Sequence, residues 1–210
     1  MDRRFFIKKT ALAAGALALT GKGVSTNVLP KLFGEEPRMK LSYNIDRKFK
    51  IVQFTDIHWK AAVHQSREAA DCMNNVLDTE KPDLVFYTGD HVTGEPIDKG
   101  IDAIFEPVVS RAIPFAAVLG NHDDEFSMNR VEIYDHIRQF PGNLTGTVDG
   151  ITGVTNFVIP LYQSSSERVM NVIYGLDSNR GVIEPDQVAW YNRVSQEFTK
   201  LNKGNPIPSL

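Results

Sequence analysis

The sequence predicts an α/β fold in which helices cover a parallel sheet. The chain has 210 residues, of which 42% are hydrophobic and 23% are charged, as in a folded protein with one main core. From residue 49 onward, three short apolar runs alternate with two segments of helical periodicity. The order strand, helix, strand, helix, strand is typical of right-handed parallel units.

The first predicted strand covers residues 49–54 and is followed by a helix predicted over residues 66–79, with Ser66 as a candidate N-cap. The apolar face of this helix consists of Ala69, Ala70, Met73, Val76 and Leu77. Cys72 shares that face, so we expect it in the core. As the single cysteine it excludes both an internal disulfide and a cysteine-ligated metal site.

The second predicted strand, residues 84–88, is rich in apolar and aromatic side chains and ends at Gly89 and Asp90. A second helix is predicted over residues 99–111, where Pro107 must kink or shorten it. The third strand, residues 113–119, is uniformly apolar, which indicates a buried strand of a parallel sheet.

The C-terminal part predicts two further strands, residues 156–162 and 169–176, joined by a polar turn. A helix is expected from Pro185, because proline suits the first helical position. Residues 207–210 are expected to approach another strand. These elements place the folded domain at residues 49–210.

Residues 1–30 are predicted to be a signal peptide of the twin-arginine type. The segment RRFFIK resembles the twin-arginine pattern, and the apolar run after it has about ten residues, where a membrane span needs roughly 20. We therefore expect export by the twin-arginine machinery to the periplasm or beyond, with no stable membrane anchor after signal removal. An uncleaved amphipathic N-terminus is the alternative. Residues 31–48 are expected to form an irregular lead-in.

The charge of the chain argues against nucleic-acid binding. The net charge is −3, but residues 1–30 carry +4, so the remainder has 18 basic and 25 acidic residues. An acidic body offers no electrostatic attraction to nucleic acid or to anionic lipid.

Polar side chains follow the first three predicted strands. Asp56 and His58 follow the first strand, Asp90 the second, and Asn121 and His122 the third. Since the carboxyl ends of parallel strands meet at one edge, these side chains are expected to lie together. Carboxylate, imidazole and amide donors suit Mn, Fe or Zn better than Ca or Mg. The sequence therefore predicts a transition-metal site.

Three short motifs sharpen this prediction. They are Asp56-Ile57-His58, Gly89-Asp90 and the run from Gly120 to Asp123, spaced by about 30 residues. In this order they resemble the D-x-H, G-D and G-N-H-[DE] motifs of the calcineurin-like metallophosphoesterases. The resemblance covers residues 49–210 and implies an α/β-β/α sandwich of two mixed sheets flanked by helices.

The resemblance also implies roles for individual residues. Asp56 and His58 would bind the first of two divalent or trivalent metal ions (Mn, Fe or Zn), Asp90 would bridge both, and Asn121 would bind the second. His122 would be catalytic near the leaving oxygen, where an imidazole can donate a proton at neutral pH. Asp123 would orient its ring.

The function implied is hydrolysis of a phosphate monoester or diester by a hydroxide that two metal ions activate. Its substrate would be a small phosphorylated molecule or a phosphoprotein. The alternative is a catalytically inactive domain of the same fold that acts only as a binding module. His91, beside Asp90, is expected either to face a phosphate or to lie exposed in its loop.

The sequence departs from the family pattern in two places. The family completes its site with later histidines, but residues 137–210 contain none, so we expect an incomplete site, missing C-terminal strands and a longer parent protein. Thr93 stands where purple acid phosphatases have the tyrosine of G-D-x-x-Y. Asp177 after a strand and Gln187 on the next helix resemble exported phosphatase-like members.

Overall fold

The computed structural model describes residues 39–210, so the predicted signal peptide and residues 31–38 of the lead-in lie outside the described residues. The described strands are β1 (Leu41–Ser42), β2 (Ile51–Phe54), β3 (Leu84–Tyr87), β4 (Phe115–Ala117), β5 (Phe157–Tyr162) and β6 (Val169–Gly175). The described helices are α2 (His64–Glu80), α3 (Ile97–Ser110), α4 (Arg130–Ile137) and α5 (Pro185–Leu201).

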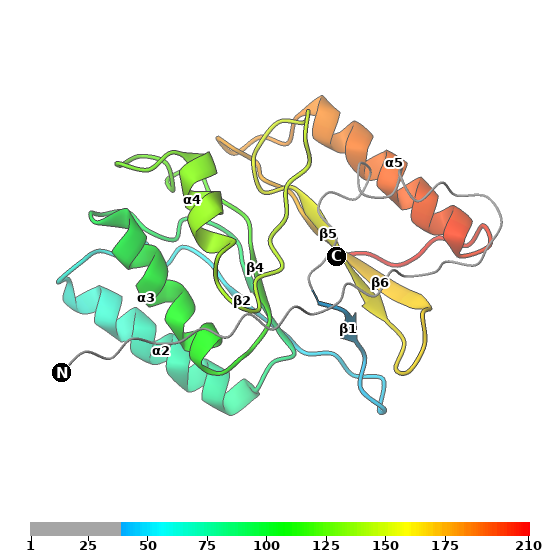
Figure 1. The fold of residues 1–210 in the computed structure, drawn as a ribbon, viewed down its shortest axis with the longest axis horizontal. Coiled ribbons are helices and arrows are strands. Elements are labelled where there is room, and N and C mark those ends of the chain that lie inside the picture. Colours follow the sequence, from blue (N-terminus) through cyan, green and yellow to red (C-terminus); the bar gives the residue numbers. More distant parts are fainter. Residues whose placement is uncertain (1–38) are drawn as a thin grey trace, which may run out of the picture.

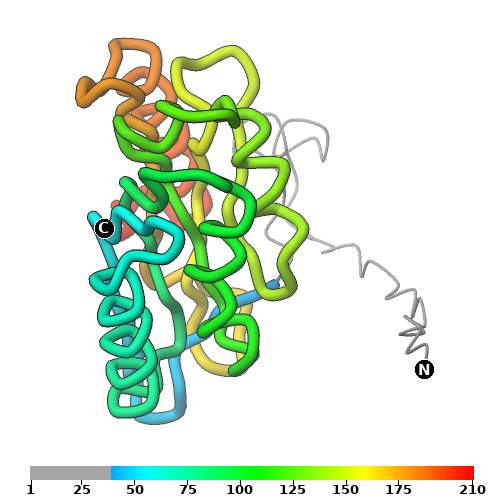
Figure 2. The backbone as a smooth tube through the Cα atoms, turned by 90° about the vertical axis from the view of Figure 1, so that its left-hand side faces the viewer, coloured from blue at the N-terminus to red at the C-terminus, as the bar shows by residue number. Residues whose placement is uncertain are grey.

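The strands form two sheets that face each other between helices, which confirms the predicted sandwich (Figure 1), although only one of the two described sheets is mixed, whereas two mixed sheets are predicted. The first sheet has the order β2-β3-β4 and is parallel throughout. The second has the order β1-β5-β6 and is mixed, because β1 runs parallel to β5 while β6 runs antiparallel to it. Helices α2, α3 and α4 cover the outer side of the first sheet, and α5 covers the second. Figure 2 shows α2 and α3 side by side.

Successive side chains of β3 point to opposite faces of the first sheet and so contribute to two separate hydrophobic clusters. Val85 and Tyr87 contact the helices, whereas Leu84 and Phe86 belong to the cluster between the two sheets. All four side chains are buried, as expected for a central parallel strand. The strand is therefore held on both faces, which fixes the position of the loop that follows it.

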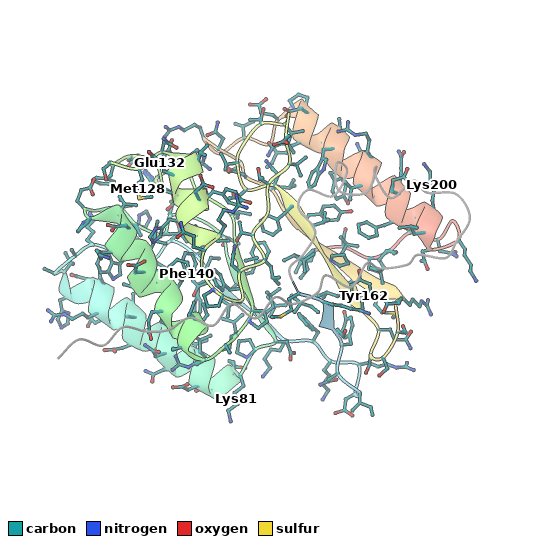
Figure 3. The ribbon with its side chains drawn as sticks, in the orientation of Figure 1. Lys81, Met128, Glu132, Phe140, Tyr162 and Lys200 are labelled. Carbon is teal, nitrogen blue, oxygen red and sulfur yellow. The ribbon has the colours of Figure 1, made fainter. Side chains whose placement is uncertain are left out.

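The outer layers bury one face of each helix. Trp190 of α5 is 1% exposed and packs on the second sheet, which supports a packing role for it. Lys200 of the same helix is exposed on its outer side, and Phe140, after α4, packs against the cluster under the first sheet (Figure 3). Within residues 39–210, no helix combines the length and apolar character that a membrane span requires.

Two predictions for α2 are wrong. The helix begins at His64 with Val63 as its N-cap, and the Ser66 hydroxyl instead accepts a hydrogen bond from the Lys60 main-chain N–H at 2.8 Å. Cys72 is exposed, because the buried positions of the helix are Ser66, Met73 and Leu77.

The lead-in is more regular than predicted, since β1 lies within it and pairs with the end of β5. Leu41 opposes Leu161 and is 6% exposed. At the other end of the chain, the expected approach to a strand is confirmed, because Ser209 forms a parallel bridge with Val172 of β6.

Candidate metal centre

The candidate site lies at the C-terminal ends of the first sheet, where main-chain hydrogen bonds join the loops after β2 and β3. The Asp56 N–H donates to the Gly89 carbonyl at 3.1 Å, and the His58 N–H donates to the Asp90 carbonyl at 2.9 Å. The loop after β2 is thus fastened to the loop after β3. This is the edge at which the sequence places the ligands.

Asp56, His58 and Asp90 come together there. One ligand atom from each lies within 4.8 Å of the other two. His58 Nε2 is 3.7 Å from Asp90 Oδ2 and 3.9 Å from Asp56 Oδ1. The Asp90 side chain is 11% exposed, while those of His58 and Asp56 are 42% and 62% exposed. Two carboxylates and an imidazole in this arrangement fit a transition-metal ion that remains accessible to solvent and substrate.

Asn121 lines the same cavity as Asp56 and Asp90. This cavity has a volume of about 410 Å³ and opens between the two sheets. Its apolar wall is formed by Phe86, Val118, Tyr174 and Leu176. The cavity therefore offers ligands on one side and an apolar surface on the other, which is the usual composition of a small-molecule site.

The backbone at the three clustered residues is strained. Asp56, His58 and Asp90 have φ angles of 52°, 46° and 53°, in the left-handed region that non-glycine residues rarely adopt. Such conformations cost on the order of 1–3 kcal/mol each and persist only where surrounding contacts impose them. Here they turn three ligand side chains toward one point, as is common at functional sites.

Two glycines allow the loops to approach each other. A Cβ atom on Gly89, which has a φ of 102°, would lie 2.6 Å from Gly120 Cα. A Cβ atom on Gly120 would lie 2.9 Å from the Asp90 carboxyl carbon. Neither position has room for a side chain, which explains the glycine before Asp90 and before Asn121.

His122 lies at the edge of this cluster. Its main-chain N–H donates to Asp90 Oδ1 at 3.0 Å, and its ring centroid is 5.7 Å from that of His58. Its Nδ1 is 2.7 Å from Glu125 Oε1, and this hydrogen bond is the largest cause that raises the pKa of His122. The structure thus places His122 beside Asp90 and His58, with Glu125 as the partner of its ring.

The prediction that Asp123 orients the His122 ring is wrong. Asp123 is 2% exposed, and its carboxylate accepts hydrogen bonds from the main-chain N–H groups of Gly120 at 2.7 Å and His91 at 2.6 Å. Burial raises the pKa of Asp123, but the His91 ring and these N–H donors outweigh it, so the net pKa lies below the usual value. Asp123 therefore fastens the loop after β4 to the loop after β3.

His91 fits neither reading proposed for it. The residue is 2% exposed and its Nδ1 lies 2.9 Å from Asp123 Oδ2. Its ring packs near those of Tyr87 and Phe105, at centroid distances of 6.1 and 5.9 Å. His91 is thus a core residue under the site and does not face a phosphate.

A buried ion pair joins Arg130 of α4, which packs on the first sheet, to Asp177, which follows β6 of the second sheet. Arg130 of α4 also donates to the carbonyls of Leu119 and Gly120, at 3.2 and 2.7 Å. Asp177, which follows β6 and is 0% exposed, accepts from the Val154 N–H at 2.8 Å. Arg130 therefore supports the turn that carries Asn121.

Sequence reasoning missed Glu125 and Arg130 as residues of the site. An acidic residue three positions after His122, in the same turn, is a local signal that could have indicated Glu125. Arg130 and Asp177 are 47 residues apart, and no local pattern indicates their pairing. Gln187 belongs to the same buried group, since its side chain donates to the Asp177 carbonyl at 2.8 Å.

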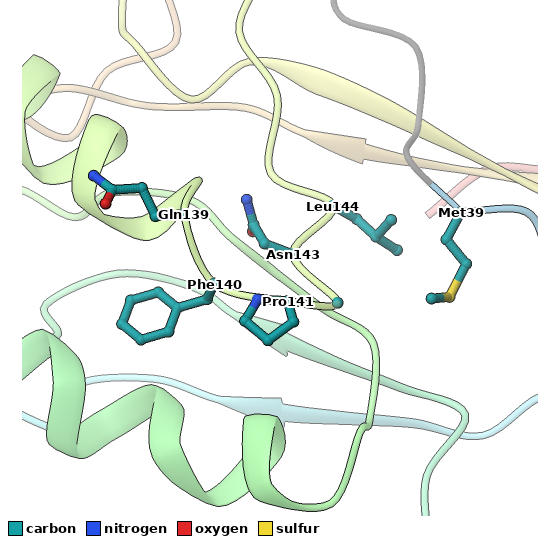
Figure 4. Close-up of a pocket in the computed structure, with 7 residues that line it drawn as sticks. Met39, Gln139, Phe140, Pro141, Asn143 and Leu144 are labelled. Atoms are coloured by element: carbon teal, nitrogen blue, oxygen red, sulfur yellow. The ribbon is translucent and has the colours of Figure 1, made fainter. Parts of the chain in front are cut away.

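A second cavity, of about 250 Å³, lies at the loop after α4 (Figure 4). It is lined by Met39 and residues 139–144, none of which carries a carboxylate or an imidazole. Its lining provides no ligand set comparable to that of the first cavity.

Comparison with known proteins also indicates a phosphoesterase family. A family model described as calcineurin-like phosphoesterase matches residues 49–207. "Probable inactive purple acid phosphatase 29" of Arabidopsis thaliana is 28% identical over 207 residues, which cover 81% of this chain and 53% of that protein. "Phosphatase DCR2" of Saccharomyces cerevisiae is 30% identical over 164 residues, covering 67% of this chain and 28% of that protein. The chain thus spans about half of the first relative and less than a third of the second.

Proposed function

Since the chain belongs to the calcineurin-like phosphoesterase family, we propose that it hydrolyses a phosphate monoester or diester in a metal-dependent reaction. The observation that carries this proposal is the convergence of Asp56, His58 and Asp90, whose ligand atoms lie within 4.8 Å of one another. The substrate would be a small phosphorylated molecule or a phosphoprotein that enters the adjacent cavity.

The residues present fit the metal ions of such a reaction. Asp56 and His58 would hold one Mn, Fe or Zn ion, Asp90 would bridge to a second, and Asn121 would contribute its amide oxygen to the second. Bound ions of this kind acidify a water molecule and neutralise charge on the phosphate oxygens. The apolar wall formed by Phe86 and its neighbours would limit the access of other water.

His122 would act on the leaving oxygen. Glu125 binds its Nδ1, so Nε2 is the nitrogen available to donate a hydrogen bond to the substrate. The hydrogen bond from the His122 main chain to Asp90 ties the position of this ring to the bridging carboxylate. The proposed catalytic group and the proposed bridging ligand would therefore be positioned together.

Replacing His122 with alanine is expected to lower turnover by about 10²–10⁴, the usual contribution of a general acid, while the bound metal is retained. Phosphate release from an alkyl phosphate such as glycerol 2-phosphate, whose departing alkoxide needs a proton, and metal content by mass spectrometry, measured on one sample, test this. His64→Ala on α2 is the control, because its side chain is 73% exposed and pairs with Glu68 on the same helix. Metal loss in His122→Ala would show that this residue is a ligand and would contradict the assigned role.

A binding module without catalysis is the second candidate function. Its support is that three of the relatives carry the words "probable inactive" in their names. Turnover of a phosphate monoester and of a diester in metal-replete buffer separates the two candidates. Bound metal with no turnover of either substrate would favour the binding module.

We also propose that the protein is exported by the twin-arginine machinery, on the basis of the RRFFIK segment. Replacing Arg3 and Arg4 together with lysine is expected to leave the precursor in the cytoplasm, because the pair is the recognised feature. Cell fractionation followed by immunoblotting measures this, with Lys22→Gln as a control outside the pair. Equal export of the double variant and the parent protein would refute the route.

A further inference from the structure

We propose that Arg180 binds the terminal phosphoryl group of the substrate and so selects phosphate monoesters over diesters. This inference rests on the proposed function, because it assigns a substrate class to the same cavity. Arg180 lies in the loop between β6 and α5, and β6 is a strand of the second sheet. The metal ligands all come from the first sheet, so Arg180 approaches the site from the opposite side.

The guanidinium of Arg180 is fixed beside a residue of the cavity. Its Nη1 donates to the Asn121 carbonyl at 3.1 Å, and its Nη2 donates to Asp124 Oδ2 at 3.2 Å. Asn121 lines the cavity, and so does Ser178, two residues before Arg180. The guanidinium of Arg180 therefore lies against the main chain of a residue that lines the cavity.

Arg180 is held in place but remains accessible. Its side chain is 62% exposed, whereas that of Asp124 is 16% exposed and also faces Arg130 Nη1 at 3.4 Å. The two hydrogen bonds of Arg180 occupy two of the five N–H donors of a guanidinium. Three donors remain, and a guanidinium can present two of them to a phosphate in a two-point geometry.

The charges of the cavity explain why Arg180 would favour phosphate monoesters over diesters. The cavity is lined by the carboxylates Asp56 and Asp90, and none of its lining residues is a lysine or an arginine. A phosphate monoester brings three terminal oxygens and a second negative charge, whereas a diester brings two oxygens and one charge. Metal ions held at Asp90 would neutralise part of the phosphate charge, and the additional oxygen and charge of a monoester are what a further cation such as Arg180 would bind.

A surface ion pair with Asp124 is the competing explanation for Arg180. Exposed pairs of this kind contribute little to stability, and they have no effect on ligand choice. The two explanations differ in what they predict for two ligands that differ by one oxygen and one charge.

Binding of phenylphosphonate, a dianion, and methylphenylphosphinate, a monoanion, provides the test. Neither has an ester bond that the protein could hydrolyse. Titration calorimetry on the Mn²⁺-loaded protein would compare the parent chain with Arg180→Gln, Arg180→Lys and Arg168→Gln. Arg168 is exposed and lies just before β6. The length of β6 therefore separates Arg168 from the cavity.

Arg180→Gln is expected to weaken phenylphosphonate binding about tenfold, as for the loss of a charge-assisted hydrogen bond, and phosphinate binding by less than about threefold. Arg180→Lys should recover part of the loss, because it restores the charge but not the two-point geometry. Arg168→Gln should change neither affinity. Metal content should be the same in all four proteins.

The inference would be overturned if Arg180→Gln weakened the binding of both ligands equally, weakened neither, or lost metal. It would also be overturned if the parent protein did not bind phenylphosphonate. The proposed function has a separate readout. Arg180-dependent binding without turnover would overturn hydrolysis alone, whereas turnover with unchanged affinity in Arg180→Gln would overturn only the role of Arg180.

Discussion

Replacing Asp90 with asparagine is expected to lower turnover by more than about a hundredfold and to deplete bound metal. Residues that only orient metal ligands already contribute roughly 10–100-fold, so loss of a bridging carboxylate should cost more. Asparagine has nearly the same shape, and its amide oxygen can still accept the hydrogen bond from the His122 main chain. The variant should therefore fold normally, which isolates the effect of the charge.

Metal content, turnover and the circular dichroism spectrum of Asp90→Asn would be measured together. Asp102→Asn is the control, because this carboxylate lies on α3 and pairs with His136 and Lys99, away from the ligands. Normal metal content with lost turnover would mean that Asp90 does not bridge two ions. Normal turnover would remove Asp90 from the site altogether.

Replacing Arg130 with methionine is expected to give the largest loss of stability, about 3–5 kcal/mol in the free energy of unfolding. The loss is large because Asp177, 0% exposed, would keep its charge without a cationic partner. The carbonyls of Leu119 and Gly120 would also lose their donor. Urea unfolding followed by fluorescence or circular dichroism measures the difference.

Arg111→Met is the matched control for this variant. Arg111 also pairs with an aspartate, Asp78, and donates to a main-chain carbonyl, but the Asp78 side chain is 65% exposed. Its replacement should cost much less. The double variant Arg130→Met/Asp177→Asn should recover part of the loss, since it no longer buries an unpaired charge. If Arg130→Met and Arg111→Met were equally stable, burial of the Arg130–Asp177 pair would not be the cause of the stability loss in Arg130→Met.

The positions of Asp56, Asp90 and Asn121 could be predicted because a general rule of parallel sheets applies to them. Each follows an apolar strand, and the structure brings the ends of β2, β3 and β4 to one edge. The predicted layers also hold, because alternation within strands and periodicity within helices are local properties of the sequence.

The partners of His122 and Asp123 could not be predicted in the same way. Neighbours in sequence need not face the same direction, and here His122 is turned to Glu125 while Asp123 is turned inward to His91. The contact with His91 joins residues 32 positions apart and exists only because β3 and β4 are adjacent.

Sequence patterns also could not predict the two-residue strand β1 or the exposure of Cys72. β1 has two residues, too few for a period of two, and it exists through its pairing with β5. Cys72 is expected in the core because it shares the apolar face of the predicted helix, but it is exposed, and its neighbour Met73 takes the buried position on α2.

Metal dependence of turnover is the most direct test of hydrolysis at the Asp56, His58 and Asp90 cluster. The purified protein would be assayed with a phosphate monoester and a diester as isolated, after removal of metal by a chelator, and after return of Mn²⁺ or Zn²⁺, with bound metal measured at each step. We predict turnover that disappears with the metal and returns with it. Turnover that survives complete removal of metal, or no turnover with the metal fully bound, would contradict the proposed function.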